Sequence, residues 1–155
     1  MHSEYSFTKE TLIHNFKLII DKDIPLTSNL ANLSRVLFES FPNTSWAGFY
    51  LTDSVGNKLY LGPFQGPVAC TEIAFGKGVC GMAALKQTSQ LVPNVHEYPG
   101  HIACSSLTNS EIVVPIMKND FCVGVIDLDS TKFNNYSEAD VAILEQCSSL
   151  ISCLF

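Results

Sequence analysis

The feature that most constrains the fold is a pair of apolar runs, residues 111–117 and 121–129, separated by a short polar turn at 118–120. Two strand-like runs joined by so short a turn predict an antiparallel β-hairpin. Pro115 interrupts the first run, and a proline cannot donate a hydrogen bond to a neighbouring strand, so we expect an edge position or a bulge there. The sheet of this protein therefore contains an antiparallel pair near its C-terminal end.

Helical patterns lie on either side of the strand-like region. Apolar residues recur at helical spacing in two segments that follow Thr8 and Ser28, and in a C-terminal segment that follows Ser137. Each of these residues can cap a helix, and Asp140 would complete a capping box with Ser137. Further elements are expected between the helices: strands at 46–51, 58–61, 68–75 and 90–92, a short helix at 79–86, and loops at 62–67 and 93–110.

This order of elements predicts a single α+β domain over residues 1–155, with an antiparallel sheet and helices packed on its faces. The chain has 155 residues, 46% of them hydrophobic and 15% charged, which is enough apolar material for one core. The net charge of −6 gives no basic excess, so we expect no nucleic-acid partner. No apolar run approaches the roughly 20 residues of a membrane span, so we expect no membrane association.

The N-terminal residues lack the basic and apolar regions of a secretory signal, so we expect a cytoplasmic protein with reduced thiols. A chain of this size would also enter a nucleus by diffusion in a eukaryotic cell. Three of the six cysteines are then expected to have only a structural role, as small hydrophobic residues: Cys122, Cys147 and Cys153. The other three, Cys70, Cys80 and Cys104, lie at junctions of loops, strands and helices, where reaction is favoured over packing. Near a helix N-terminus, Cys80 would be favoured as the thiolate.

Three carboxylates form the second candidate cluster. A hairpin centred on Asn119 would place Glu111 opposite Asp127, and Asp129 would share the face of Asp127 because side chains alternate along a strand. Like charges so close raise one another's pKa unless a cation lies among them. Apart from Lys118 at the other end of the hairpin and Lys132, no lysine or arginine lies near Glu111 or Asp127 in the sequence, which indicates a bound ammonium group or metal. The alternative is a solvated strand end with scattered acids, and a one-residue register slip would break the cluster.

Two further residues are open to more than one interpretation. Trp46, the only tryptophan, is either core or a pocket wall whose face could contact a methyl-sulfur group or a cation. His101 either pairs with a Cys104 thiolate or is an ordinary loop histidine. A zinc site from Cys70, Cys80, Cys104 and His101 is disfavoured, because structural zinc ligands usually come in close pairs. We therefore expect no bound metal and no other bound cofactor.

Six segments, in this order and spacing, resemble the free methionine-R-sulfoxide reductases, which are stand-alone GAF-domain proteins. They are residues 62–66, 69–70, 75–81, 99–104, 110–115 and 124–129. The resemblance covers nearly the whole chain and implies a GAF fold, with a six-stranded antiparallel sheet flanked by helices. It also implies reduction of free methionine-R-sulfoxide to methionine, with thioredoxin as the external reductant. Whether the chain forms a homodimer is left open.

The resemblance assigns a role to each candidate residue. Cys104 matches the nucleophile, Cys70 the resolving cysteine, and Cys80 a third cysteine that can join a secondary disulfide. The substrate-binding positions of the family correspond to Trp46, Glu111, Asp127 and Asp129. Two positions depart from the family pattern: Ser105, where relatives commonly have aspartate, and Met82, where they often have threonine. The alternatives are a non-catalytic GAF module that senses a small ligand, and a zinc-stabilised interaction protein.

Overall fold

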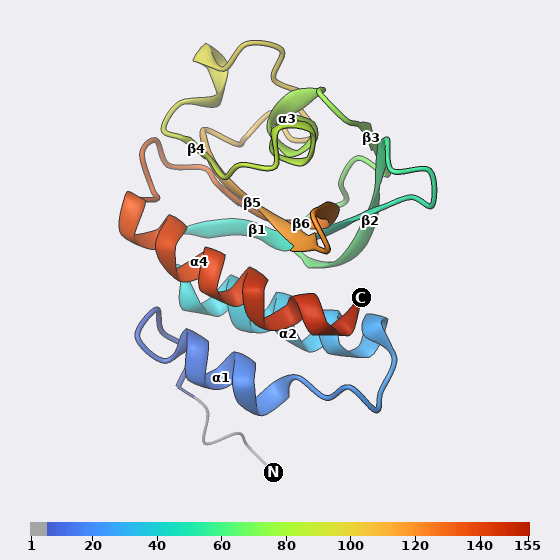
Figure 1. Cartoon of the computed structure of the whole chain (residues 1–155). Helices are drawn as coiled ribbons and strands as arrows, with labels where there is room; N and C mark the ends of the chain where they lie inside the picture. Colours follow the sequence, from blue (N-terminus) through green and yellow to red (C-terminus); the bar gives the residue numbers. More distant parts are fainter. Residues whose placement is uncertain (1–5) are drawn as a thin grey trace.

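A six-stranded antiparallel sheet forms the centre of the protein, as shown by a computed structural model that describes residues 6–155 (Figure 1). The strands are β1 (Thr44–Thr52), β2 (Lys58–Gln65), β3 (Glu72–Ala74), β4 (Gln90–Val92), β5 (Ser110–Lys118) and β6 (Phe121–Ser130). Their order in the sheet is β3-β2-β1-β6-β5-β4. The helices are α1 (Leu12–Ile19), α2 (Leu26–Ser40), α3 (Gly78–Lys86) and α4 (Glu138–Ile151), with short 3-10 turns at Val95–Glu97 and Ser152–Leu154. The α+β class and the six-stranded antiparallel sheet are therefore confirmed.

Helices cover the two faces of the sheet unequally. In Figure 1, α2 and α4 lie beneath the sheet, α1 lies below them, and α3 lies on the opposite face. Strand β1 shows the alternation that builds both layers: Ala47 and Phe49 join the core between the sheet and helices α2 and α4, whereas Trp46 and Tyr50 join the cluster that includes Cys80 of α3. One face of the sheet thus carries the larger apolar core, and the α3 face carries a smaller apolar cluster.

The hairpin of β5 and β6 has a different register from the expected one. Its turn has two residues, Asn119 and Asp120, both with the positive φ that such tight turns require, and a bulge follows in the strands. Glu111 consequently pairs with Asp129 rather than with Asp127. The expected pairing is wrong by two residues, but a shift of two keeps every side chain on its face.

Pro115 lies where β5 has only one neighbour. Strand β4 pairs with β5 no further than Val113, so the proline faces no second strand. Its carbonyl accepts a hydrogen bond from Ser148 Oγ of α4 at 2.7 Å. The expected edge position is confirmed, since no strand hydrogen bond on the β4 side is lost at this residue.

Several element boundaries differ from the expectations. Helix α1 begins at Leu12 rather than directly after Thr8, and α2 follows Pro25, so that Ser28 lies within the first turn and is not a cap. The capping box expected at the start of α4 is present. No helix in residues 6–155 is long and apolar enough to cross a membrane.

Strand β2 continues through residues 62–65, which the sequence predicts as a loop. A Cβ atom at Gly48 of β1 would lie only 2.4 Å from the Cβ atom of Phe64, so the glycine allows the two strands to stay paired there. Strand β3, in contrast, is shorter than the expected 68–75. Cys70 therefore lies in a loop that can approach the neighbouring segment 99–108, rather than in a strand.

Candidate active site

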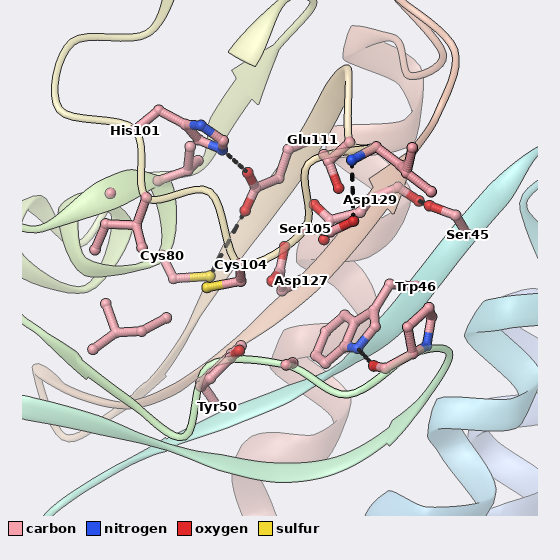
Figure 2. A pocket seen from close by; sticks show the side chains of 18 of the residues that line it. Ser45, Trp46, Tyr50, Cys80, His101, Cys104, Ser105, Glu111, Asp127 and Asp129 are labelled. Carbon is pink, nitrogen blue, oxygen red and sulfur yellow. Dashed lines mark hydrogen bonds and ion pairs between the residues drawn. The ribbon is translucent and has the colours of Figure 1, made fainter. Parts of the chain in front are cut away.

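A cavity of about 90 Å³ lies on the α3 face of the sheet, between β1, β5, β6, the start of α3 and the loop after β4 (Figure 2). Among its lining residues are six of the seven candidates: Trp46, Cys80, Cys104, Glu111, Asp127 and Asp129. The seventh candidate, Cys70, forms a disulfide bond with Cys104. The fold thus gathers at one place residues that are up to 83 positions apart in the chain.

Cys70 and Cys104 form a disulfide across a 34-residue separation, with their Cα atoms 5.4 Å apart. Both residues are partly exposed, and they come from loops that flank the cavity. The free thiols in the described part of the chain are Cys80, Cys122 and Cys147, which are buried, and Cys153, which is exposed. The set of four ligands considered for zinc is not assembled here, because the bonded pair supplies two of its members.

Cys80 is the third residue of α3, as expected, but it is not favoured as a thiolate. Burial raises the pKa of its thiol well above the usual value, and the charges of Asp127 and Glu111 raise it further. Its Sγ atom lies 3.9 Å from Oε1 of Glu111. The prediction of a thiolate at this helix start is wrong, because the sequence does not reveal that carboxyl groups and apolar walls surround the sulfur.

The predicted carboxylate cluster is present on β5 and β6. Burial raises the pKa of Glu111, Asp127 and Asp129 well above their usual values, and in each case the charge of a neighbouring carboxylate adds to the effect. The Oδ1 atoms of both aspartates are buried and have no hydrogen-bond partner. The cluster therefore holds at least one proton readily, and it offers oxygen atoms to a bound cation.

His101 points to Glu111. Its Nε2 atom lies 3.7 Å from Oε2 of Glu111, and burial lowers the pKa of its imidazole (Figure 2). Neither of the two interpretations drawn from the sequence included this contact. The spacing of His101 from Cys104 gave no signal for this contact, since Glu111 comes from strand β5 and His101 from the loop before it.

Trp46 is both core and cavity wall, with an exposed fraction of 6%. Its ring stacks on Tyr50 and on Phe64, with centroids 5.8 Å and 5.2 Å away, and its Nε1 donates to the carbonyl of Pro67 at 3.1 Å. Sequence reasoning missed Tyr50, whose hydroxyl donates to the carbonyl of Cys70 at 3.0 Å. The signal was its position four residues after Trp46, an even spacing that places both side chains on one face of the strand.

The two departures from the family pattern fall differently around the site. Ser105 lines the cavity, and its Oγ accepts a hydrogen bond from the backbone N–H of Leu107 at 3.2 Å. It therefore stabilises the turn that follows Cys104. Met82 lies within α3 and is not among the residues that line the cavity.

Comparisons with known proteins agree with this geometry. The model of the GAF domain family matches residues 26–153. A protein named free methionine-R-sulfoxide reductase from Saccharomyces cerevisiae is 45% identical over 154 residues, which cover 94% of this chain and 86% of that protein. The protein of the same name from Escherichia coli is 40% identical over 135 residues, 87% of this chain and 81% of its own.

A solved structure provides the comparison in three dimensions. The X-ray structure of free methionine-R-sulfoxide reductase from Neisseria meningitidis, in complex with its substrate, has a TM-score of 0.84 and 40% sequence identity. The similarity covers 95% of this chain and 86% of that one. The fold is therefore shared with a protein of that name over most of both chains.

Proposed function

Because the chain belongs to the free methionine-R-sulfoxide reductases of the GAF-domain family, we propose that it reduces free L-methionine-R-sulfoxide to L-methionine. The observation that carries the proposal is the Cys70–Cys104 disulfide at the rim of a cavity walled by three buried carboxyl groups. A redox-active cysteine pair beside proton-holding acids matches the needs of sulfoxide reduction. A module that only senses a ligand needs neither.

Cys104 is the proposed nucleophile. In the reduced enzyme its thiolate attacks the sulfoxide sulfur, and a proton is delivered to the sulfoxide oxygen. The hydroxyl group then passes from the substrate sulfur to the Cys104 sulfur as the bond between the two sulfurs breaks, so that methionine leaves and Cys104 becomes a sulfenic acid. The thiol of Cys70 then attacks that sulfur, so that water leaves and the disulfide forms. The partners are already adjacent, since their Cα atoms lie 5.4 Å apart in the oxidised protein.

The buried acids supply the proton and bind the substrate. Their raised pKa values favour the protonated form of the cluster, which is the form that a general acid needs. A second carboxyl, ionised, pairs with the ammonium group of the free amino acid. The unpartnered Oδ1 atoms of Asp127 and Asp129 are the acceptors available for that group. The indole of Trp46 forms the apolar wall for the methyl-sulfur end.

Thioredoxin is the proposed reductant of the resulting disulfide. Both half-cystines are partly exposed, which supports attack by the thiolate of a protein dithiol. Cys80 is buried and has a raised pKa, so its part in a secondary disulfide requires the α3 start or the neighbouring loops to move.

The test is NADPH consumption in an assay coupled through thioredoxin reductase and thioredoxin, with free methionine-R-sulfoxide as the substrate and methionine measured directly. We expect one methionine for each NADPH, and little turnover of the S diastereomer. Binding of the sulfoxide without methionine formation, with thioredoxin or with dithiothreitol, would refute the enzyme and favour the sensing module.

A further inference from the structure

The oxidised protein retains one thiol at the carboxylate cluster. The Sγ atom of Cys80 and one oxygen atom each from Glu111 and Asp127 all lie within 4.8 Å of one another, and all three residues are buried. The other oxygen of Glu111 lies 3.7 Å from His101 Nε2. A sulfur and two carboxylate oxygens thus converge on one point of the cavity wall, and the His101 imidazole lies beside one of these carboxyl groups.

We propose that Cys80, Glu111 and Asp127 bind a divalent cation of the Zn²⁺ class, that His101 moves from its contact with Glu111 to complete the ligand set, and that the ion excludes the sulfoxide substrate from the cavity. The binding itself is independent of catalysis, whereas the inhibition rests on the proposed function. This ligand set differs from the sequence-based zinc set, since it uses neither half of the disulfide. The ion is a competitor of the substrate and not a cofactor.

The donor spacing fits a tetrahedral ion. With Zn–S near 2.3 Å and Zn–O near 2.0 Å, a sulfur and an oxygen on one tetrahedral zinc lie about 3.5 Å apart. The Sγ atom of Cys80 is 3.9 Å from Oε1 of Glu111, so a displacement of a few tenths of an ångström brings both to bonding distance. Side-chain rotation alone supplies such a movement.

An unpartnered oxygen independently points to a ligand. Asp127 has an exposed fraction of 5%, lines the cavity, and leaves Oδ1 without a hydrogen-bond partner. Buried charges are normally paired or bound to a metal. Among the ion pairs of the described residues, none brings a lysine or arginine to this cluster.

The chemistry of the donors selects the class of ion. Calcium and magnesium prefer sites made wholly of oxygen atoms, whereas thiolate with imidazole suits zinc and its neighbours. Binding releases the Cys80 proton and any proton shared by the two carboxyl groups, because each group coordinates in its deprotonated form. The positive ion then compensates the negative charges that otherwise repel one another in the cavity.

Co²⁺ is the probe for the test, used with the full-length protein in its oxidised form. The disulfide removes Cys70 and Cys104 from the free thiols, so a sulfur-to-cobalt charge-transfer band reports one of the remaining four. We expect one equivalent of Co²⁺ to give that band together with the strong visible bands of tetrahedral cobalt. Zn²⁺ should displace the cobalt and abolish both.

Matched variants assign the thiol. The bands should disappear in Cys80→Ala and persist in Cys153→Ala, which removes an exposed thiol elsewhere in the chain. Asp127→Asn, which keeps the size of the side chain, should weaken Zn²⁺ affinity more than about tenfold, since even groups that only orient a ligand contribute 10–100-fold. Absence of the bands in the wild-type protein, or their persistence in Cys80→Ala, would overturn the site.

A second measurement separates this proposal from the proposed function. Methionine formation in a single turnover of reduced enzyme should fall with added Zn²⁺ and return with a chelator, and Cys80→Ala should need more Zn²⁺ for the same loss, because Zn²⁺ held by Cys104 alone would inhibit both proteins equally. Cobalt bands in a protein that forms no methionine would refute the reductase and leave the metal site standing. Methionine formation by a protein without cobalt bands would refute the metal site alone.

Discussion

Glu111 of β5 lies directly opposite Asp129 of β6, and both carboxyl groups face the cavity that also contains Cys104. This pairing brings two acids together on neighbouring strands without a lysine or arginine partner among the ion pairs of the described residues. The acids are costly to ionise there, as their raised pKa values show. Ionisation of these acids therefore lowers the stability of the folded protein, and the same acids can hold protons or accept a cation.

Replacing Cys104 by serine should abolish the first turnover. A serine hydroxyl cannot take the sulfoxide oxygen as a sulfenic acid, so no methionine should form even with excess dithiothreitol. Methionine is measured by amino-acid analysis after one turnover. The matched control is Cys153→Ser, which changes an exposed thiol and should retain activity. Full activity of Cys104→Ser would eliminate this residue as the nucleophile.

Replacing Cys70 by serine should separate the two halves of the cycle. One equivalent of methionine should still form, because Cys104 is intact, but recycling by thioredoxin should stop for want of the resolving thiol. NADPH consumption in the coupled assay reports the loss. Residual recycling that disappears in the Cys70→Ser/Cys80→Ser double variant would show that Cys80 reaches the sulfenic acid after loop movement.

Replacing Asp129 by asparagine should stabilise the protein at neutral pH. Burial, with the charge of Asp127, raises the folded-state pKa of Asp129 above its unfolded value, so the folded state holds the proton more tightly. Wild-type stability is therefore full below about pH 4 and falls as the pH rises towards the folded-state pKa. The variant should gain about 1–3 kcal/mol at pH 8 and less at pH 5.

The measurement for Asp129 is urea unfolding at both pH values in buffer with a chelator, so that no metal ion compensates the charge. The same variant should lose activity, since it removes a proposed substrate contact. A variant that is less stable than wild type at pH 8 would contradict the burial of an ionisable group at this position.

The enzyme should discriminate against methionine sulfoxide within a polypeptide. An N-acetylated, amidated substrate of the same R configuration has no ammonium group to pair with Asp127 or Asp129. Its kcat/KM should fall at least about tenfold, because a hydrogen bond to a charged group contributes about 1.5–3 kcal/mol. The sulfoxide of methionine amide, which keeps the ammonium group, isolates that contact. Equal turnover of all three substrates would exclude recognition of the amino group.

Replacing Gly81 by alanine should loosen the start of α3. The added Cβ atom would lie 2.3 Å from the carbonyl oxygen of Ala74, a backbone atom that cannot rotate away. We expect a loss of about 1–3 kcal/mol in the free energy of unfolding. Ser28→Ala, on the exposed side of α2, is the control and should change stability by less than about 0.5 kcal/mol. An unchanged unfolding midpoint in Gly81→Ala would contradict the close packing of α3 on β3.

Periodicity in the sequence was enough to predict the architecture. The apolar runs at 111–117 and 121–129 and the helical spacing in the terminal segments are local properties, and they indicate which residues an element must bury. Boundaries were less well determined, as Ser28 and residues 62–65 show. A helix can begin at Pro25 without using a serine, and strand pairing at Phe64 depends on a glycine in another strand.

Alternation of side chains within one strand was enough to predict from the sequence that Asp127 and Asp129 share one face, whereas the place of Glu111 beside them depended on the register between β5 and β6. The sequence also identified Cys70, Cys80 and Cys104 as the cysteines to examine. The folded structure was needed to show which carboxyl groups pair, that His101 contacts Glu111, and that Cys80 is buried rather than activated. Those outcomes depend on groups far apart in the chain, whose distances and solvent exposure are set when the two faces of the sheet are covered.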